Sequence, residues 1–169
     1  MTDDEDAARA IDQFWQVARV KARLSTLGGV LGETPAATVA PQAWAFGDSP
    51  ELADELLDLV LAGTKTATAE LAWNYEAAHE PLPAPRDLSI VLDGAGAPRA
   101  LLRTTKVDVV PFSSVTAEHA RLEGEGDGTL ESWRADHERY WRRNMPAGRE
   151  FSGDAPVICE RFTLVFPKP

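Results

Sequence analysis

Apolar positions between Thr2 and Leu24 recur at spacings of three and four residues, which is the pattern of an amphipathic helix. The residues on this face are Ala7, Ile11, Phe14, Trp15, Ala18 and Ala22. Thr2 and Glu5 have the spacing of a capping box. The next stretch, residues 28–43, is rich in glycine, proline and small side chains. We therefore predict a helical appendage at 1–27, a linker at 28–43, and a main domain at 44–169.

The start and end of a second helix are marked by its flanking residues. Ser49 is a typical N-cap, Pro50 suits the first turn, and Gly63 suits the position after the last turn. The residues predicted to face the core are Leu52, Leu56, Leu59 and Val60. The chain that follows Gly63 therefore leaves a helix end.

The remaining pattern alternates between strands and helices. Leu88–Asp93 and Arg99–Val110 are rich in β-branched residues and flank a turn, which predicts a β-hairpin. Helical periodicity returns at Thr116–Glu123 and Leu130–Arg143, and Val157–Phe166 alternates as a closing strand. Short connections between these elements predict an α+β domain with a small, strongly curved sheet or barrel.

Composition narrows the class of partner. The 169 residues carry 17 basic and 27 acidic side chains, a formal charge of −10, which opposes binding to a long phosphate backbone. A pocket for one nucleotide or a short, flexible strand stays compatible with this charge. The single cysteine, Cys159, excludes an internal disulfide and a cysteine-rich zinc site. No apolar run long enough to span a bilayer and no signal peptide is visible, so we expect a cytoplasmic protein.

Three segments carry motifs that together resemble the ASCH family. They are GTKTAT at 63–68, EHARLEGEGD at 118–127 and CERF at 159–162, and the resemblance runs from Trp44 to Phe166. It implies a PUA-like β-barrel flanked by helices, a fold associated with RNA binding. Some branches of the family are ribonucleases and others are amidohydrolases of acylated nucleosides. Arg86 departs from the pattern, because relatives commonly carry glycine before the aspartate that corresponds to Asp87.

The resemblance to the amidohydrolase branch implies a catalytic group of Lys65, Thr68 and Glu123. Chemically, Thr68 is a candidate nucleophile that needs a base. Lys65 could be that base only in its neutral form, which burial favours and a nearby carboxylate opposes. Alternatively, Glu123 or an activated water is the base, and a charged Lys65 stabilises an oxyanion or holds a phosphate. A solvated lysine that caps its own helix is the structural alternative.

Further residues are predicted to bind the substrate. His119 lies four residues before Glu123 and shares its helical face. Arg161 lies in the closing strand, where it could pair with Glu123 or meet a phosphate. The remaining members follow the lysine motif directly and offer a stacking surface and hydrogen-bond groups: Trp73, Asn74 and Tyr75.

Other interpretations of the same residues stay open. The spacing of Glu123, Glu125 and Asp127 permits a divalent-metal loop, although we expect no cofactor. The aromatic residues of 130–143 either pack that helix onto the sheet or stack on RNA bases beside arginines. We therefore predict an RNA- or nucleoside-directed hydrolase, either a ribonuclease or an amidohydrolase. The alternative is a non-catalytic module that binds single-stranded RNA or a nucleotide. A weaker alternative assigns the first helix to protein interaction, including a homodimer contact.

Overall fold

The computed structural model describes residues 3–22, 24 and 39–168. The predicted capping box at Thr2 and most of the predicted linker at 28–43 lie outside the described residues. Two compact units are present. The first contains the described residues of 1–62, 88–103 and 164–169, and the second contains 63–87 and 104–163. None of the described helices is long and apolar enough to cross a membrane.

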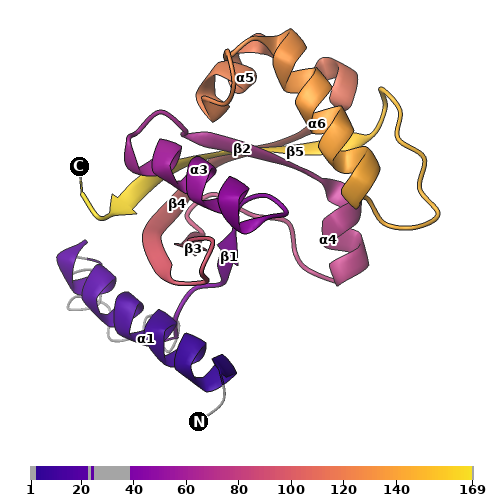
Figure 1. The fold of residues 1–169 in the computed structure, drawn as a ribbon. Coiled ribbons are helices and arrows are strands. Elements are labelled where there is room, and N and C mark those ends of the chain that lie inside the picture. The colour runs from indigo at the N-terminus through magenta and orange to yellow at the C-terminus, as the bar shows by residue number, and fades with distance from the viewer. Residues whose placement is uncertain (1–2, 23, 25–38, 169) are drawn as a thin grey trace. The chain divides into compact units, whose positions relative to one another are not determined.

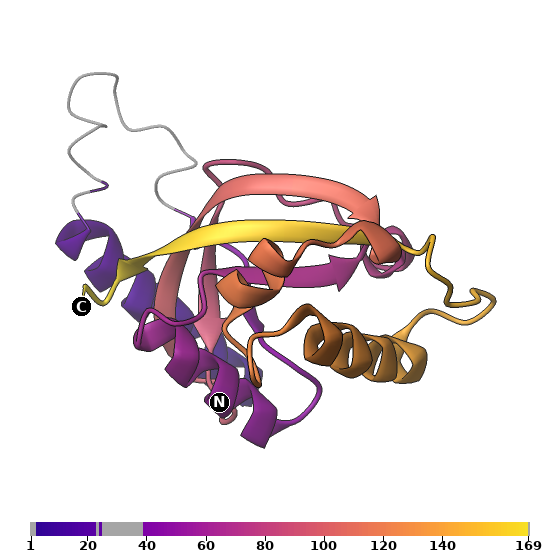
Figure 2. The same cartoon turned by 90° about the horizontal axis from the view of Figure 1, so that it is seen from above.

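The described strands form one five-stranded sheet in the order β1-β3-β4-β5-β2. Their bounds are β1 Ala43–Ala45, β2 Ala67–Leu71, β3 Leu88–Leu92, β4 Pro98–Pro111 and β5 Pro156–Phe166. β1 pairs with β3 in parallel, whereas β3 with β4 and β2 with β5 are antiparallel. Figure 2 shows the long strands β4 and β5 running side by side. The predicted hairpin and closing strand are confirmed, whereas β1 and β2 were not predicted.

In the first unit, helix α1 (Asp3–Lys21) packs its apolar face into the core. Trp15 and Ala18 are buried in a cluster with Ile90 of β3 and Leu101 of β4. Burying apolar surface in this way is the main favourable term in folding. The predicted helix is therefore confirmed, and its buried face belongs to the core of this unit.

Helix α3 (Pro50–Leu61) has the ends that the sequence predicts. The Ser49 hydroxyl accepts a hydrogen bond from the Leu52 amide at 3.2 Å, as an N-cap does. Gly63 follows the C-cap residue with a φ of +75°, a conformation that glycine adopts without a steric penalty. The chain therefore leaves the helix at the predicted position.

In the second unit, helices α4 (Ala72–Ala78), α5 (Ala117–Glu123) and α6 (Leu130–Asn144) accompany β2 and β5. Figure 1 shows α5 and α6 on the same side of these two strands. Trp133 and Trp141 of α6 are buried in the apolar cluster that includes Leu71 and Val157 of the strands. The packing interpretation is therefore confirmed for both tryptophans, and the stacking interpretation is wrong for them because their rings are not accessible.

A tight turn at 84–87 precedes β3. The Asp87 amide donates to the Ala84 carbonyl at 3.0 Å, and Arg86 has a φ of +84°. Pro85 before a residue with positive φ is the arrangement of a type II turn, in which glycine is preferred at the third position. Arg86 takes the position at which this turn prefers glycine, so an arginine adopts the left-handed conformation here.

Candidate active site

The segment before β2 is held tightly between two elements of the second unit. The Thr66 amide donates to the Leu122 carbonyl at the end of α5 at 2.8 Å. The Thr66 carbonyl accepts from the Phe162 amide of β5 at 3.0 Å. These bonds fix the backbone of Thr66, the residue directly after Lys65. The side chain of Lys65 is consequently placed beside the last turn of α5.

Glycine is needed where this segment meets the end of α5. A Cβ atom on Gly124 would lie 2.6 Å from the Thr64 carbonyl oxygen, which is closer than real Cβ atoms come. Gly124 also has a φ of +67°, which favours glycine. The first glycine of the EGEG motif therefore lets α5 end directly against the lysine motif.

A buried ionic cluster results from this close approach. The Lys65 Nζ atom lies 3.2 Å from Glu123 Oε2 and also contacts Glu125 Oε1. Lys65 and Glu123 are each only 1% exposed. The interpretation of Lys65 as a solvated helix cap is therefore wrong. Charges that are removed from water need such partners, because an isolated buried charge is strongly unfavourable.

The second oxygen of Glu123 is held by other side chains. The Trp133 indole donates to Glu123 Oε1 at 2.8 Å. His119 Nε2 lies 3.0 Å from the same oxygen without hydrogen-bond alignment. Burial raises the pKa of Glu123, but the charges of Lys65 and His137 outweigh this effect and hold the pKa well below its usual range. Glu123 is therefore a carboxylate at neutral pH.

His137 of α6 completes the cluster and was not among the predicted site residues. Its Nδ1 atom lies 2.9 Å from the Trp133 carbonyl oxygen, which assigns the Nδ1 proton because a carbonyl only accepts. Its Nε2 atom lies 3.5 Å from Glu123 Oε2. Burial lowers the pKa of His137, but the Glu123 carboxylate outweighs burial and the pKa is raised. The sequence signal is the four-residue spacing of Trp133 and His137, which puts both side chains on one helical face.

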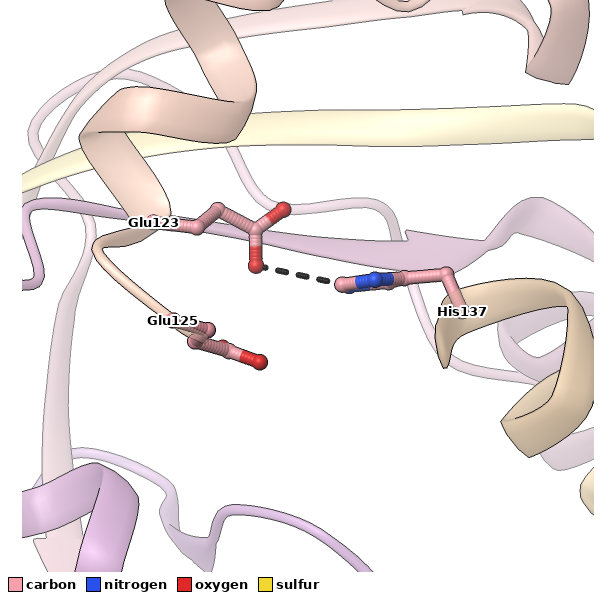
Figure 3. A group of neighbouring side chains, drawn as sticks. All are labelled: Glu123, Glu125 and His137. Carbon is pink, nitrogen blue, oxygen red and sulfur yellow. Dashed lines mark ion pairs between the residues drawn. The ribbon is translucent and has the colours of Figure 1, made fainter. Parts of the chain in front are cut away.

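The same cluster contains the best candidate for metal ligands among the described residues. Figure 3 shows Glu123, Glu125 and His137 pointing toward one another, with ligand atoms that all lie within 4.8 Å. The Lys65 ammonium already contacts both of these carboxylates. Asp127, the third member of the predicted metal loop, is exposed and accepts hydrogen bonds from Thr129 instead. A divalent ion would have to displace the lysine, so we assign no metal here.

Thr68 makes none of the contacts of this cluster. It lies in β2 and pairs with Glu160 of β5 in the antiparallel register. Side chains alternate along a strand, so Thr68 and Glu160 share the face opposite that of Ala69 and Cys159. The structure therefore joins Lys65 to Glu123 directly and places Thr68 beside a carboxylate that the sequence interpretation did not consider.

Two of the predicted substrate-binding residues, Asn74 and Tyr75, follow β2 and are influenced by a second carboxyl, that of the half-buried Glu70. Glu70 Oε1 accepts from Asn74 Nδ2 at 2.8 Å and from Trp141 Nε1 at 2.9 Å. Burial raises the pKa of Glu70 despite these hydrogen bonds. Burial, helped by the charges of Glu160 and Glu70, raises the pKa of Tyr75 to about 12. Asn74 is therefore engaged within the fold, and Tyr75 is a neutral phenol.

The remaining predicted binding residues have partners of their own. The Arg149 guanidinium lies 5.2 Å from the centre of the half-buried Trp73 ring. Arg161 pairs with Glu118 at 3.3 Å, so its expected pairing with Glu123 is wrong, because Lys65 occupies that position. His119 does lie beside Glu123, as the shared helical face predicts. These contacts leave the roles of Trp73, Arg161 and His119 toward a substrate as predictions.

Comparison with known proteins identifies the family. The ASCH domain model matches residues 42–166. A protein of Enterococcus faecalis V583 has a similar structure, with a TM-score of 0.75 and 31% identity over 94% of this chain and 91% of that chain. The ASCH domain of Lactobacillus crispatus JV V101 is similar with a TM-score of 0.70 and 26% identity over 86% and 94%. No curated protein matches the chain. These similarities confirm the predicted α+β, PUA-like fold, and the chain belongs to the ASCH domain family.

Proposed function

We propose that this protein is a hydrolase that acts on RNA or a modified nucleoside, and that amide hydrolysis of an acylated nucleoside is its reaction. The observation that carries this proposal is the Lys65–Glu123 ion pair, which is closed to water within the second unit. A buried ion pair is weak support for a stabilising role, because well-packed apolar residues often stabilise as much. Ion pairs in such environments are instead frequent at functional sites.

The charge of the cluster favours the amide reaction over cleavage of a phosphodiester. One ammonium, that of Lys65, faces two carboxylates, those of Glu123 and Glu125. Even with a protonated His137 the group has no net positive charge to attract a phosphate. Phosphodiester cleavage is often assisted by a metal ion. Here the Lys65 ammonium already contacts the two carboxylates that would have to bind such an ion. Hydrolysis of a neutral acylated nucleoside needs neither a net positive charge nor a metal ion.

In the proposed reaction the three residues have separate roles. Thr68 supplies the hydroxyl that attacks the acyl carbon, because it is the only one of the three that is partly accessible. Lys65 is closed to water and lies with Glu123 on the side of β2 opposite Thr68, so its role is to position the segment that carries Thr68. Glu123 positions Lys65, and Trp133 in turn fixes Glu123.

The test is hydrolysis of N4-acetylcytidine and of a short single-stranded RNA by the purified protein, each with EDTA and with added Mn²⁺. We expect acetate release from N4-acetylcytidine that EDTA does not reduce. Thr68→Val and Lys65→Met should abolish it, whereas Lys106→Met, which removes an exposed lysine of β4, should not. RNA cleavage that requires Mn²⁺ would instead favour the ribonuclease branch. Salt-sensitive RNA binding without turnover of either substrate would favour the non-catalytic module.

A further inference from the structure

We infer, on the basis of the proposed amide hydrolysis, that Glu160 of β5 is the general base that activates Thr68. The sequence interpretation gave this role to Glu123, to Lys65 or to a water molecule. The strand register gives Thr68 a different carboxylate neighbour.

The geometry follows from the pairing of β2 with β5. Thr68 and Glu160 are direct partners in the antiparallel register, so their side chains lie on the same face with Cβ atoms about 4.5–5.5 Å apart. The flanking pairs, Ala67 with Arg161 and Ala69 with Cys159, point to the opposite face. A glutamate opposite a threonine at this separation is long enough for its carboxyl group to reach the hydroxyl.

Glu160 and Glu123 differ in how far their side chains are exposed to solvent. Thr68 and Glu160 are both half-buried, so a substrate can reach them, whereas Glu123 is only 1% exposed. Both oxygens of Glu123 already face Lys65, His137 and Trp133. A carboxylate with a strongly lowered pKa is also a weak base. Glu123 is therefore suited to holding Lys65 and poorly suited to accepting a proton from Thr68.

The surroundings of Glu160 raise its pKa, which makes it a stronger base than an exposed carboxylate. The Thr104 hydroxyl of β4 donates to Glu160 Oε1 at 2.5 Å and holds that oxygen on the side of β5 away from β2, so Oε2 is the oxygen that would take the Thr68 proton. Burial raises the pKa of Glu160, the Thr104 hydrogen bond opposes this, and the negative charge of Asp87 adds to the rise. Tyr75 is the other titratable group that interacts with Glu160, and its own pKa is near 12.

Glu70 is the other carboxyl on this face of β2, and it is already occupied. It lies two residues beyond Thr68, and its Oε1 atom accepts from Leu71, Asn74 and Trp141. Three donors on one oxygen hold the side chain toward α4 and α6. Glu160 is therefore the carboxyl of this face that directly neighbours the nucleophile.

The proposed reaction has two stages, the formation of an acyl-threonine and its hydrolysis. Thr68 Oγ forms a bond to the acyl carbon while Glu160 takes the hydroxyl proton and the carbonyl electron pair moves to oxygen. When that pair returns, the C–N bond breaks, and Glu160 gives the proton to the departing N4 nitrogen, which releases cytidine. Water then attacks the acyl-threonine with Glu160 as base. Acetate leaves, and Glu160 returns the proton to Thr68.

Steady-state kinetics on N4-acetylcytidine test this assignment. Glu160→Gln keeps an oxygen that accepts from Thr104 but removes the base, so kcat should fall by about 100-fold or more, with KM within about twofold. Glu160→Asp should restore part of kcat. Asp108→Asn, which changes a carboxylate of the neighbouring strand β4, is the matched control and should retain wild-type kcat.

A second variant gives a readout that a structural role of Glu160 would not produce. Thr104→Val removes the hydrogen bond that lowers the pKa of Glu160. The acid limb of the kcat/KM profile should therefore move to higher pH, and this limb should be lost in Glu160→Gln. Full activity of folded Glu160→Gln, or an acid limb unmoved by Thr104→Val, would overturn the role of Glu160 while the proposed function stands. If the wild type releases no acetate, both are overturned.

Discussion

Replacing Lys65 by methionine should strongly destabilise the fold, and replacing Glu123 as well should recover part of the loss. Methionine preserves most of the apolar volume of the lysine side chain but removes the ammonium. In Lys65→Met the Glu123 carboxylate, which is 1% exposed, loses its nearest cation. Removing one partner of a buried pair costs about 3–5 kcal/mol, because the other charge stays buried.

The side chains around Glu123 determine where in that range the loss of stability should lie. Trp133 still donates to Oε1, and His137 still lies 3.5 Å from Oε2, so we expect the lower end, about 3 kcal/mol. The double variant Lys65→Met/Glu123→Gln has no unpaired charge at Glu123 and keeps an acceptor for Trp133. It should be about 1.5 kcal/mol more stable than Lys65→Met alone.

Urea unfolding of the two variants, of Glu123→Gln and of the wild type measures this coupling as a double-mutant cycle. With an m-value of about 2 kcal/mol/M, the midpoint of Lys65→Met should fall by about 1.5 M. Lys106→Met removes an exposed lysine that pairs with Asp108 and should change stability by about 0.5 kcal/mol or less. A loss below about 1 kcal/mol for Lys65→Met, or a double variant less stable than that single variant, would refute the account of a charge pair closed to water.

Three further predictions concern other parts of the second unit. Arg86→Gly should relieve the strain of a φ of +84° and raise the melting temperature by about 2 °C, whereas Arg86→Ala should bring no such gain; a thermal scan decides this. Trp133→Phe removes the indole donor to Glu123 and should cost about 1–3 kcal/mol in urea unfolding; an unchanged midpoint would contradict the hydrogen bond. The folded pKa of His137 is raised, so its contribution to the free energy of unfolding is full below about pH 6.5 and is lost as pH rises through the raised pKa. Stability should therefore decline above about pH 6.5, and His137→Gln should flatten this decline.

The sequence predicted those helices and strands whose first and last residues carry capping or turn signals. The N-cap at Ser49 and the glycine at position 63 predicted α3, and the structure has both features. Strand β2 was missed because Ala67–Leu71 is only five residues long and contains alanine, glutamate and leucine, which favour helix over strand. It forms because its backbone pairs with β5, about 90 residues further along the chain, and no local pattern expresses that pairing.

The candidate site could be predicted only in part, because its contacts join distant segments. Lys65 and Glu123 are 58 residues apart, and only the family motifs suggested that they meet. His137 joins them from α6, whose placement beside α5 follows from tertiary packing. Glu160 became a neighbour of Thr68 through the strand register, which the sequence pattern did not specify.

The measurement that tests the central claim most directly is acetate release from N4-acetylcytidine by the wild type, Lys65→Met/Glu123→Gln and Thr68→Val, each checked for folding by circular dichroism. The account predicts turnover by the wild type that persists in EDTA, and none by either variant. Turnover by folded Thr68→Val equal to that of the wild type, or a wild type without any turnover, would contradict it.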